Sequence, residues 1–286
     1  MLSIIAENER GKQISLTYNE ENFQIDKVTG LNPPNASIAS FENIDDGDHF
    51  THSRIEKRNI VISLFIRGDV EENRLELYRV FQNKKTVKLY FETYRSNVWI
   101  EGVVETVEVD QFNNPTTCEI SVICHDPFFK SLEEFVNSLK TVESHFYFPC
   151  YTVEPKPIST YSIVQVLNLI NDGNAHSGMT VEIYAYGEVV NPIIYNRETR
   201  EYIGIGTEKN PFTMTYGDKV VITTGKNNSK IKLIRNAVET NIFNRLIKGS
   251  KFLTLSEGDN VFTYSADSGN EYIDIKFRHY AHYTGI

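Results

Sequence analysis

The side chains best suited to chemistry are the carboxylates and imidazoles between residues 45 and 52. Asp45, Asp46 and Asp48 precede His49, and His52 follows three residues later. Their spacing is not that of an EF-hand calcium loop. A zinc site would need a third ligand beside the two histidines, and the local sequence offers none. We therefore interpret this segment as a solvated turn and expect no metal site.

Other candidate catalytic groups lack the required spacing. The carboxylate pairs Asp45-Asp46, Glu71-Glu72 and Glu133-Glu134 are adjacent, and adjacent side chains point apart on helices and strands. They cannot form the facing pair of a glycosidase. No Gly-x-Ser-x-Gly elbow occurs, and Gly204-Ile205-Gly206 lacks the third glycine of a dinucleotide loop. We predict no catalytic residue, no cofactor and no enzyme activity.

Composition excludes several classes of partner. The 286 residues carry a formal net charge of -9, which disfavours general nucleic-acid binding and docking on an anionic membrane. Three cysteines (Cys118, Cys124, Cys150) have no CxxC spacing, as expected of free, mostly buried thiols in a reducing compartment. No secretory signal or membrane-spanning segment is visible, so we expect folding in a cytoplasm.

The first half of the chain reads as strands around one helix. Residues 58–67 alternate as a strand with Ile60, Ile62, Leu64 and Ile66 on one face. Asp69, with Glu72 three residues on, begins a helix that should pack Leu77, Val80 and Phe81 on a sheet. Residues 41–53 contain a polar loop, Asp45-Asp46-Gly47-Asp48, and residues 86–124 are interpreted as further strands. Asp126-Pro127 ends the last of these strands, because the residue before a proline disfavours the helical region.

The second half reads as many short strands separated by asparagine and glycine turns, which is typical of a sandwich. Residues 131–142 carry apolar residues at helical spacing and predict a short helix. The expected organisation is a domain over 1–130, a connecting segment with that helix over 131–159, and an antiparallel β-sandwich over 160–286. The fold class is mainly β, with one inserted α-helix and a β-hairpin in the first, sandwich-like domain.

The order of several short motifs resembles the distal tail protein family of siphovirus-type bacteriophages. In the first half these motifs are Gly30-Leu31-Asn32-Pro33-Pro34, Asp46-Gly47-Asp48, Arg58 before its strand, Arg67-Gly68 and Cys124-His125-Asp126-Pro127-Phe128. The second half is similar to the galectin-like sandwich often fused behind that domain, through Asn171-Asp172-Gly173, Asn191-Pro192, Tyr195-Asn196, Gly217-Asp218 and Gly258-Asp259-Asn260. His125 departs from the usual residue before the Asp-Pro pair.

The resemblance implies a structural role in the virion. The first domains would form a hexameric ring with a central channel, joining the tail tube protein to the tip or baseplate. The second domains would dock tip or tail-associated lysin-type proteins and receptor-binding or baseplate proteins. Assembly would take place in the bacterial host cytoplasm, with no membrane contact and no nucleic-acid binding beyond passage through the channel.

Two other functions stay open at the level of sequence. A cell-surface carbohydrate-binding module or adhesin would need an aromatic platform, yet residues 160–286 contain no tryptophan. Four tyrosines could replace it, namely Tyr184, Tyr186, Tyr195 and Tyr202. A depolymerase would need a cleft with paired carboxylates at glycosidase separation.

Overall fold

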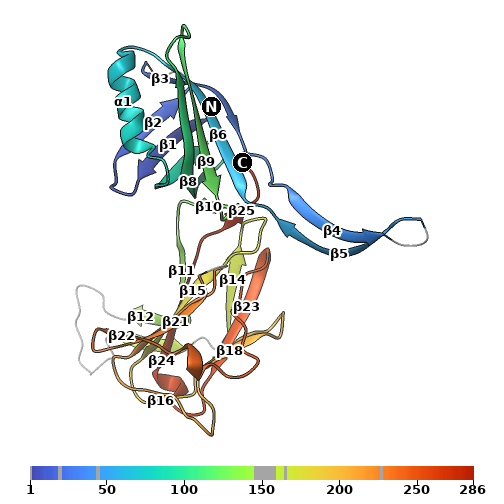
Figure 1. Cartoon of the computed structure of the whole chain (residues 1–286). Coiled ribbons are helices and arrows are strands. Elements are labelled where there is room, and N and C mark those ends of the chain that lie inside the picture. The colour runs from blue at the N-terminus through green and yellow to red at the C-terminus, as the bar shows by residue number, and fades with distance from the viewer. Residues whose placement is uncertain (1, 19–20, 43–45, 145–158, 164–165, 226–227) are drawn as a thin grey trace, which may run out of the picture. The chain divides into compact units, whose positions relative to one another are not determined.

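The computed structural model describes residues 2–18, 21–42, 46–144, 159–163, 166–225 and 228–286 (Figure 1). They fold into two compact units. Unit 1 comprises residues 1–132 and 282–286, and unit 2 comprises residues 133–281. None of the helices in the described part of the chain is long and apolar enough to cross a membrane.

Unit 1 is a closed barrel of seven strands. The strands pair in the order β7-β1-β2-β3-β6-β9, and β8 pairs with both β7 and β9 to close the barrel. Only the short β2–β3 pairing is parallel. The barrel strands are β1 (Ser3–Asn8), β2 (Gln13–Thr17), β3 (Phe23–Thr29), β6 (Arg58–Ile66), β7 (Thr86–Glu92), β8 (Asn97–Asp110) and β9 (Thr116–Cys124).

Strand alternation puts one apolar face of each strand inside this barrel. Ile60, Ile62, Leu64 and Ile66 of β6 are all buried in one core, as their spacing predicted. Two short strands extend the sheet beyond β8: β10 (Phe129–Ser131) pairs with β8, and β25 (His282–Tyr283) pairs with β10. The last residues of the chain therefore complete unit 1, and not the second domain as expected.

The predicted helix is confirmed. α1 (Val70–Val80) begins after Asp69, whose side chain accepts a hydrogen bond from the Glu72 amide at 3.1 Å. This contact satisfies one of the unpaired amides of the first turn. Leu77, Val80 and Phe81 are buried in the barrel core.

The residues on either side of the expected polar loop form a long hairpin. β4 (Ala36–Glu42) pairs with β5 (Asp48–Ile55) in a separate two-stranded sheet that runs away from the barrel (Figure 1). We call this hairpin the arm. The signal was present in Asp46-Gly47, because an Asp-Gly pair between alternating residues favours a hairpin turn. The polar composition of the segment reflects exposure on both faces.

Unit 2 is an antiparallel sandwich, so the mainly β, sandwich-like fold class is confirmed. Its larger sheet has the order β11 (Phe135–Ser138), β24 (Ile273–His279), β15 (Met179–Ala185), β20 (Lys219–Thr223), β21 (Lys230–Arg235), β22 (Val238–Asn241). Its smaller sheet has the order β14 (Val166–Asn171), β23 (Gly258–Ser265), β17 (Ile193–Asn196), β18 (Tyr202–Gly204). Phe262 of one sheet meets Phe277 of the other with ring centroids 5.2 Å apart.

Smaller elements complete unit 2. They are the strand pair β12 (Lys140–Ser144) and β13 (Ser159–Ile163), the strand pair β16 (Val189–Val190) and β19 (Thr213–Met214), and the 3-10 turns η1 (Phe243–Arg245) and η2 (Asn270–Tyr272).

The helix predicted over 131–142 is wrong. The chain there forms the end of β10, then β11 and the start of β12. Leu132 and Val136 are exposed, so the apolar residues do not share one buried helical face. β11 pairs with β24, more than 130 residues away in sequence. This long-range pairing overrides the local periodicity, which a sequence window cannot anticipate.

Arg58 ties together segments of unit 1 that are distant in sequence. It is only 3% exposed. Its Nε donates to the Pro127 carbonyl at 2.7 Å, and its Nη2 donates to the Thr284 carbonyl at 2.5 Å. Its Nη1 donates to the carbonyls of Gly30 and Asn32. Burial lowers the pKa of Arg58 below its ordinary value, because the buried guanidinium loses its hydration.

Replacing Arg58 by methionine should therefore lower the free energy of unfolding of unit 1. We expect a loss of about 3 kcal/mol or more, since each buried acceptor left unpaired costs roughly 1–3 kcal/mol. R58K keeps the charge without the planar fork and should lose somewhat less. Urea denaturation followed by circular dichroism measures both losses. Hydrogen exchange should also show faster exchange of the Ile286 amide, which bonds to the Leu31 carbonyl. An unchanged unfolding midpoint for R58M would contradict this role.

Asp218 plays a similar part in unit 2. It is 2% exposed and accepts from the Arg235 Nε at 2.9 Å and from the Thr215 amide at 2.7 Å. Burial raises the pKa of Asp218, but the hydrogen bonds from Arg235 and Thr215 outweigh it and hold the pKa below 3.8. Because the folded state binds this proton less tightly than the unfolded chain does, the pair stabilises unit 2 at neutral pH.

D218N should destabilise unit 2 at pH 7 and matter less in acid. The contribution of Asp218 is complete above its ordinary pKa of 3.8 and is lost as the pH falls below that value toward the lower folded pKa. The difference in unfolding free energy between wild type and D218N should therefore shrink below about pH 4. Denaturant titrations at pH 7, 5 and 3 measure it. E239Q is a matched control, because it breaks the exposed Lys232–Glu239 pair and should cost much less. A constant difference across the pH range would exclude the linkage.

Candidate functional site

The candidate metal ligands named from the sequence do not gather into a site in the described residues. His49 and His52 both lie on β5 of the arm, and Asp45 lies outside the described residues. Within the described ranges, no three histidine, cysteine, aspartate or glutamate residues lie close enough to hold a metal ion.

The cysteines that the structure describes are buried and unreactive. Cys118 and Cys124 are free and belong to the core of unit 1. Burial raises the pKa of each thiol to about 12, so neither is a nucleophilic thiolate near neutral pH. Cys150 lies outside the described residues.

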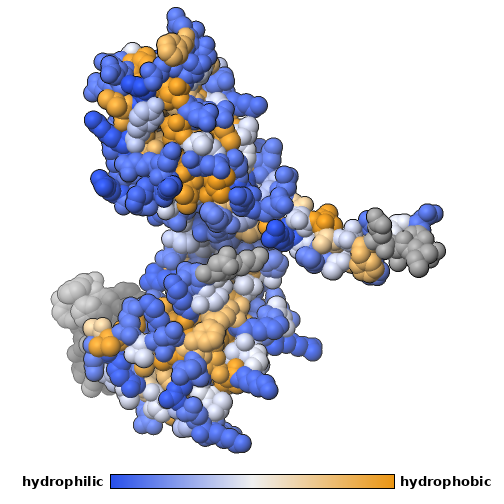
Figure 2. Space-filling model, in the orientation of Figure 1, coloured by the Kyte–Doolittle hydropathy of each residue, from blue (hydrophilic) through white to orange (hydrophobic). Residues whose placement is uncertain are grey.

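The most exposed part of unit 1 is the arm. Ile38, Phe41 and Phe50 have 68%, 57% and 59% of their surface accessible, and every residue of β5 is exposed. Figure 2 shows these apolar groups along the arm as it projects from unit 1. Each arm strand has its main contacts with the other arm strand. A two-stranded hairpin without a covering layer is only marginally stable in water, so the arm is shaped for contact with another surface.

The two faces of the arm differ in chemistry. Residues paired across a hairpin share a face, and the register has one bulge between Ala39 and Ser40. One face carries Ile38, Phe50 and Ile55, and we call it the apolar stripe. The other carries Arg54, His52 and the stacked pair of Phe41 and His49, with ring centroids 5.1 Å apart. We call it the cationic face.

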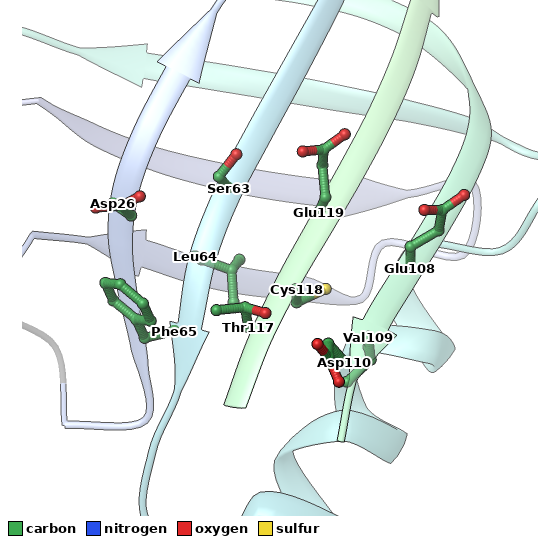
Figure 3. Close-up of a pocket in the computed structure, with 10 residues that line it drawn as sticks. All are labelled: Asp26, Ser63, Leu64, Phe65, Glu108, Val109, Asp110, Thr117, Cys118 and Glu119. Atoms are coloured by element: carbon green, nitrogen blue, oxygen red, sulfur yellow. The ribbon is translucent and has the colours of Figure 1, made fainter. Parts of the chain in front are cut away.

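A hollow of about 500 Å³ lies on the surface of the barrel, across β3, β6, β9 and β8. Its rim is acidic: Asp26, Glu108, Asp110 and Glu119 all line it, with Ser63 between them (Figure 3). We call these four carboxylates the acidic row. Glu108 and Glu119 are direct partners in the β8–β9 register. The sequence analysis missed this row, because register between strands brings its members together.

The glycines of the predicted signature in unit 1 make turns. Gly30 has φ +83°, and a Cβ there would lie 2.1 Å from the Asn59 carbonyl oxygen, so only glycine fits. Gly47 lies in the arm turn with φ +96°, and Gly68 precedes α1 with φ +65°. The Arg67 carbonyl accepts from the Asn73 side chain at 2.6 Å.

The other signature residues of unit 1 gather near Arg58. Pro127 supplies one of the carbonyls that Arg58 binds, and Phe128 stacks on His282. Asp126 pairs with Lys130 at 3.0 Å. Pro33 lies beside Gly285: a Cβ added to Gly285 would lie 3.0 Å from the Pro33 Cδ. These residues form the root of the arm and the seam that holds residues 282–286, so their observed role is structural.

The signature residues of unit 2 also shape turns. The Gly173 amide donates to Asn171, and the Pro192 carbonyl accepts from the Ile205 amide. Asn196 and Asn260 are buried, and their side chains accept hydrogen bonds from backbone amides of their own turns. Gly217 precedes Asp218 with φ +86°, and Gly258 begins β23 with φ +81°. The structure brings none of these residues together into a pocket of their own.

Comparison with known proteins bears on the identity of the chain. Residues 9–124 match the family model described as phage tail protein RIFT-related domain. No curated protein matches the chain.

Solved structures share its fold. One is the Dit protein of phage SPP1, described as a paradigm of hub adsorption apparatus in phages that infect Gram-positive hosts. It has 10% identity and a TM-score of 0.65, over 96% of this chain and 98% of that one. Another is a chain of the phage P2 baseplate in its calcium-activated conformation, with 13% identity and a TM-score of 0.52, over 97% of both chains. Residues 9–124 thus match a phage tail RIFT-related domain, and the whole chain shares its fold with the SPP1 Dit protein and the P2 baseplate chain.

Proposed function

We propose that unit 1 assembles into a hexameric ring that joins the tail tube to the baseplate or tip, and that the chain has no enzyme activity. The proposal combines the family resemblance with one observation, the exposed arm. Its apolar stripe and its cationic face are both uncovered in the single chain. A protein exposes such a ribbon at a cost in solubility unless a partner covers it.

The arm supports a ring over a two-fold dimer. It leaves the barrel at one place and presents surfaces that differ from those of the barrel wall. A contact between two different patches of the same chain is heterologous, and heterologous contacts close into rings when the rotation between neighbours permits. Gly30 and Arg58 hold the root of the arm, so its direction from the barrel is fixed well enough to set that rotation.

Unit 2 would then provide docking surfaces for tip, lysin-type or receptor-binding proteins. Three of the four tyrosines that could have stacked on a sugar contact other side chains. Lys219 and Lys276 lie 5.1 and 5.2 Å from the Tyr184 ring centroid, and Tyr195 and Tyr202 contact each other at 6.1 Å. No specific observation favours the carbohydrate-binding alternative.

Removing the arm should abolish the ring without unfolding unit 1. The Glu56 amide donates to the Asn35 carbonyl at 2.9 Å, so the two ends of the arm already adjoin. A short Gly-Ser turn can therefore replace residues 36–55. We expect the shortened chain to keep its thermal midpoint and to stay monomeric, while the full chain forms rings in mass photometry and negative-stain microscopy. Rings of the shortened chain would contradict the role of the arm. A full chain that is monomeric at high concentration and in isolated tails would contradict the ring itself.

A further inference from the structure

The acidic row leaves an unrelieved repulsion on the barrel. Glu108 and Glu119 face each other across β8 and β9, and like charges directly opposite in a sheet are destabilising. Asp26 and Asp110 add two more carboxylates around the same hollow. Among the ion pairs of the described residues, none involves these four side chains. A cationic partner lying in the hollow would relieve this repulsion.

The cationic face of the arm has the complementary character. Arg54 forms no ion pair or hydrogen bond with the described residues, and the imidazole of His52 offers a further hydrogen-bond donor to carboxylates. A guanidinium donates to two carboxylate oxygens at once, which suits a row of paired acids. Phe41 lies on the same face and Phe65 lies in the wall of the hollow, so each surface also carries one aromatic ring.

Net charge makes this match informative. A chain with net charge -9 repels its own copies at long range, and a local patch of opposite sign lowers this repulsion where two copies meet. The cationic face is such a patch. The arm runs away from its own barrel (Figure 1), so the cationic face can meet the acidic row only on another copy.

We propose that the cationic face of the arm docks on the acidic row of a neighbouring copy, with Arg54 placed between Glu108 and Glu119. The inference rests on the proposed ring and deepens it by naming the receiving surface. It assigns one face of the arm only. The apolar stripe lies on the opposite face and makes a separate contact, so the two contacts can be tested apart.

Charge reversal on both sides gives a direct test with full-length chains. R54E should repel the acidic row, and E108K/E119K should repel the arm. Each variant alone should raise the protein concentration at half-assembly by about tenfold or more, because like charges brought together at an interface cost several kcal/mol. Mixing the two variants restores opposite charges at every contact of an alternating ring. An equimolar mixture should therefore close into rings of six in mass photometry. E92K is the matched control, because Glu92 is exposed on β7 outside the hollow.

The possible outcomes separate this inference from the proposed ring. If the wild type forms rings and both variants form them equally well, the ring stands and the docking site is wrong. If E108K/E119K blocks assembly but mixing with R54E does not restore it, the acidic row receives a different partner and the inference is overturned. If the wild type forms no ring in solution or in isolated tails, the proposed function itself fails. Thermal midpoints of all variants check that the barrel remains folded.

Discussion

The fold of unit 1 depends on one buried cation. Arg58 begins β6 and donates hydrogen bonds to carbonyls of four other residues, which lie just after β3, before the arm, after β9 and just after β25. Its guanidinium also lies over the Phe129 ring at 4.4 Å. A planar fork with five donors can satisfy several carbonyls at once, which no other side chain can do. The Arg58 side chain therefore holds both the root of the arm and the seam of residues 282–286.

This arrangement links stability to assembly. A barrel has no free edge, so the strands of unit 1 that close on each other offer little for a neighbour to pair with. The arm instead carries its apolar and cationic side chains clear of the barrel. Since Arg58 anchors both ends of the arm to the barrel seam, the contacts that hold the monomer also aim the surface that would contact the next subunit.

Charge distribution gives the proposed contact its direction. The acidic row and the cationic face lie on different parts of unit 1, so a copy can give an arm on one side and receive one on the other. Contacts of this kind repeat around a ring. Once the ring closes, every copy has both its arm and its acidic row in contact with a neighbour. Unit 2 pairs its buried Asp218 internally, with Arg235.

The sequence by itself determined the local elements. The alternation of Ile60, Ile62, Leu64 and Ile66 fixed a core strand, and Asp69 with Glu72 fixed the start of α1, because both signals depend on neighbours within a few residues. Gly30 and Gly217 marked turns that need positive φ. The order of these motifs also revealed the family of the N-terminal domain.

Only the tertiary structure decided the strand at 135–138, the return of residues 282–286 to the barrel, and the acidic row. In the first two cases the deciding partner is remote in sequence: β24 for β11, and Arg58 for Thr284. The acidic row depends on the register between four strands, which places Asp26 of β3 near Glu108, Asp110 and Glu119 of β8 and β9. The apolar residues over 131–142 do have helical spacing, but the segment forms strands. Pairing with an existing sheet outweighs the small propensity differences of a short segment. Register across strands is a property of the closed barrel, and no window of sequence contains it.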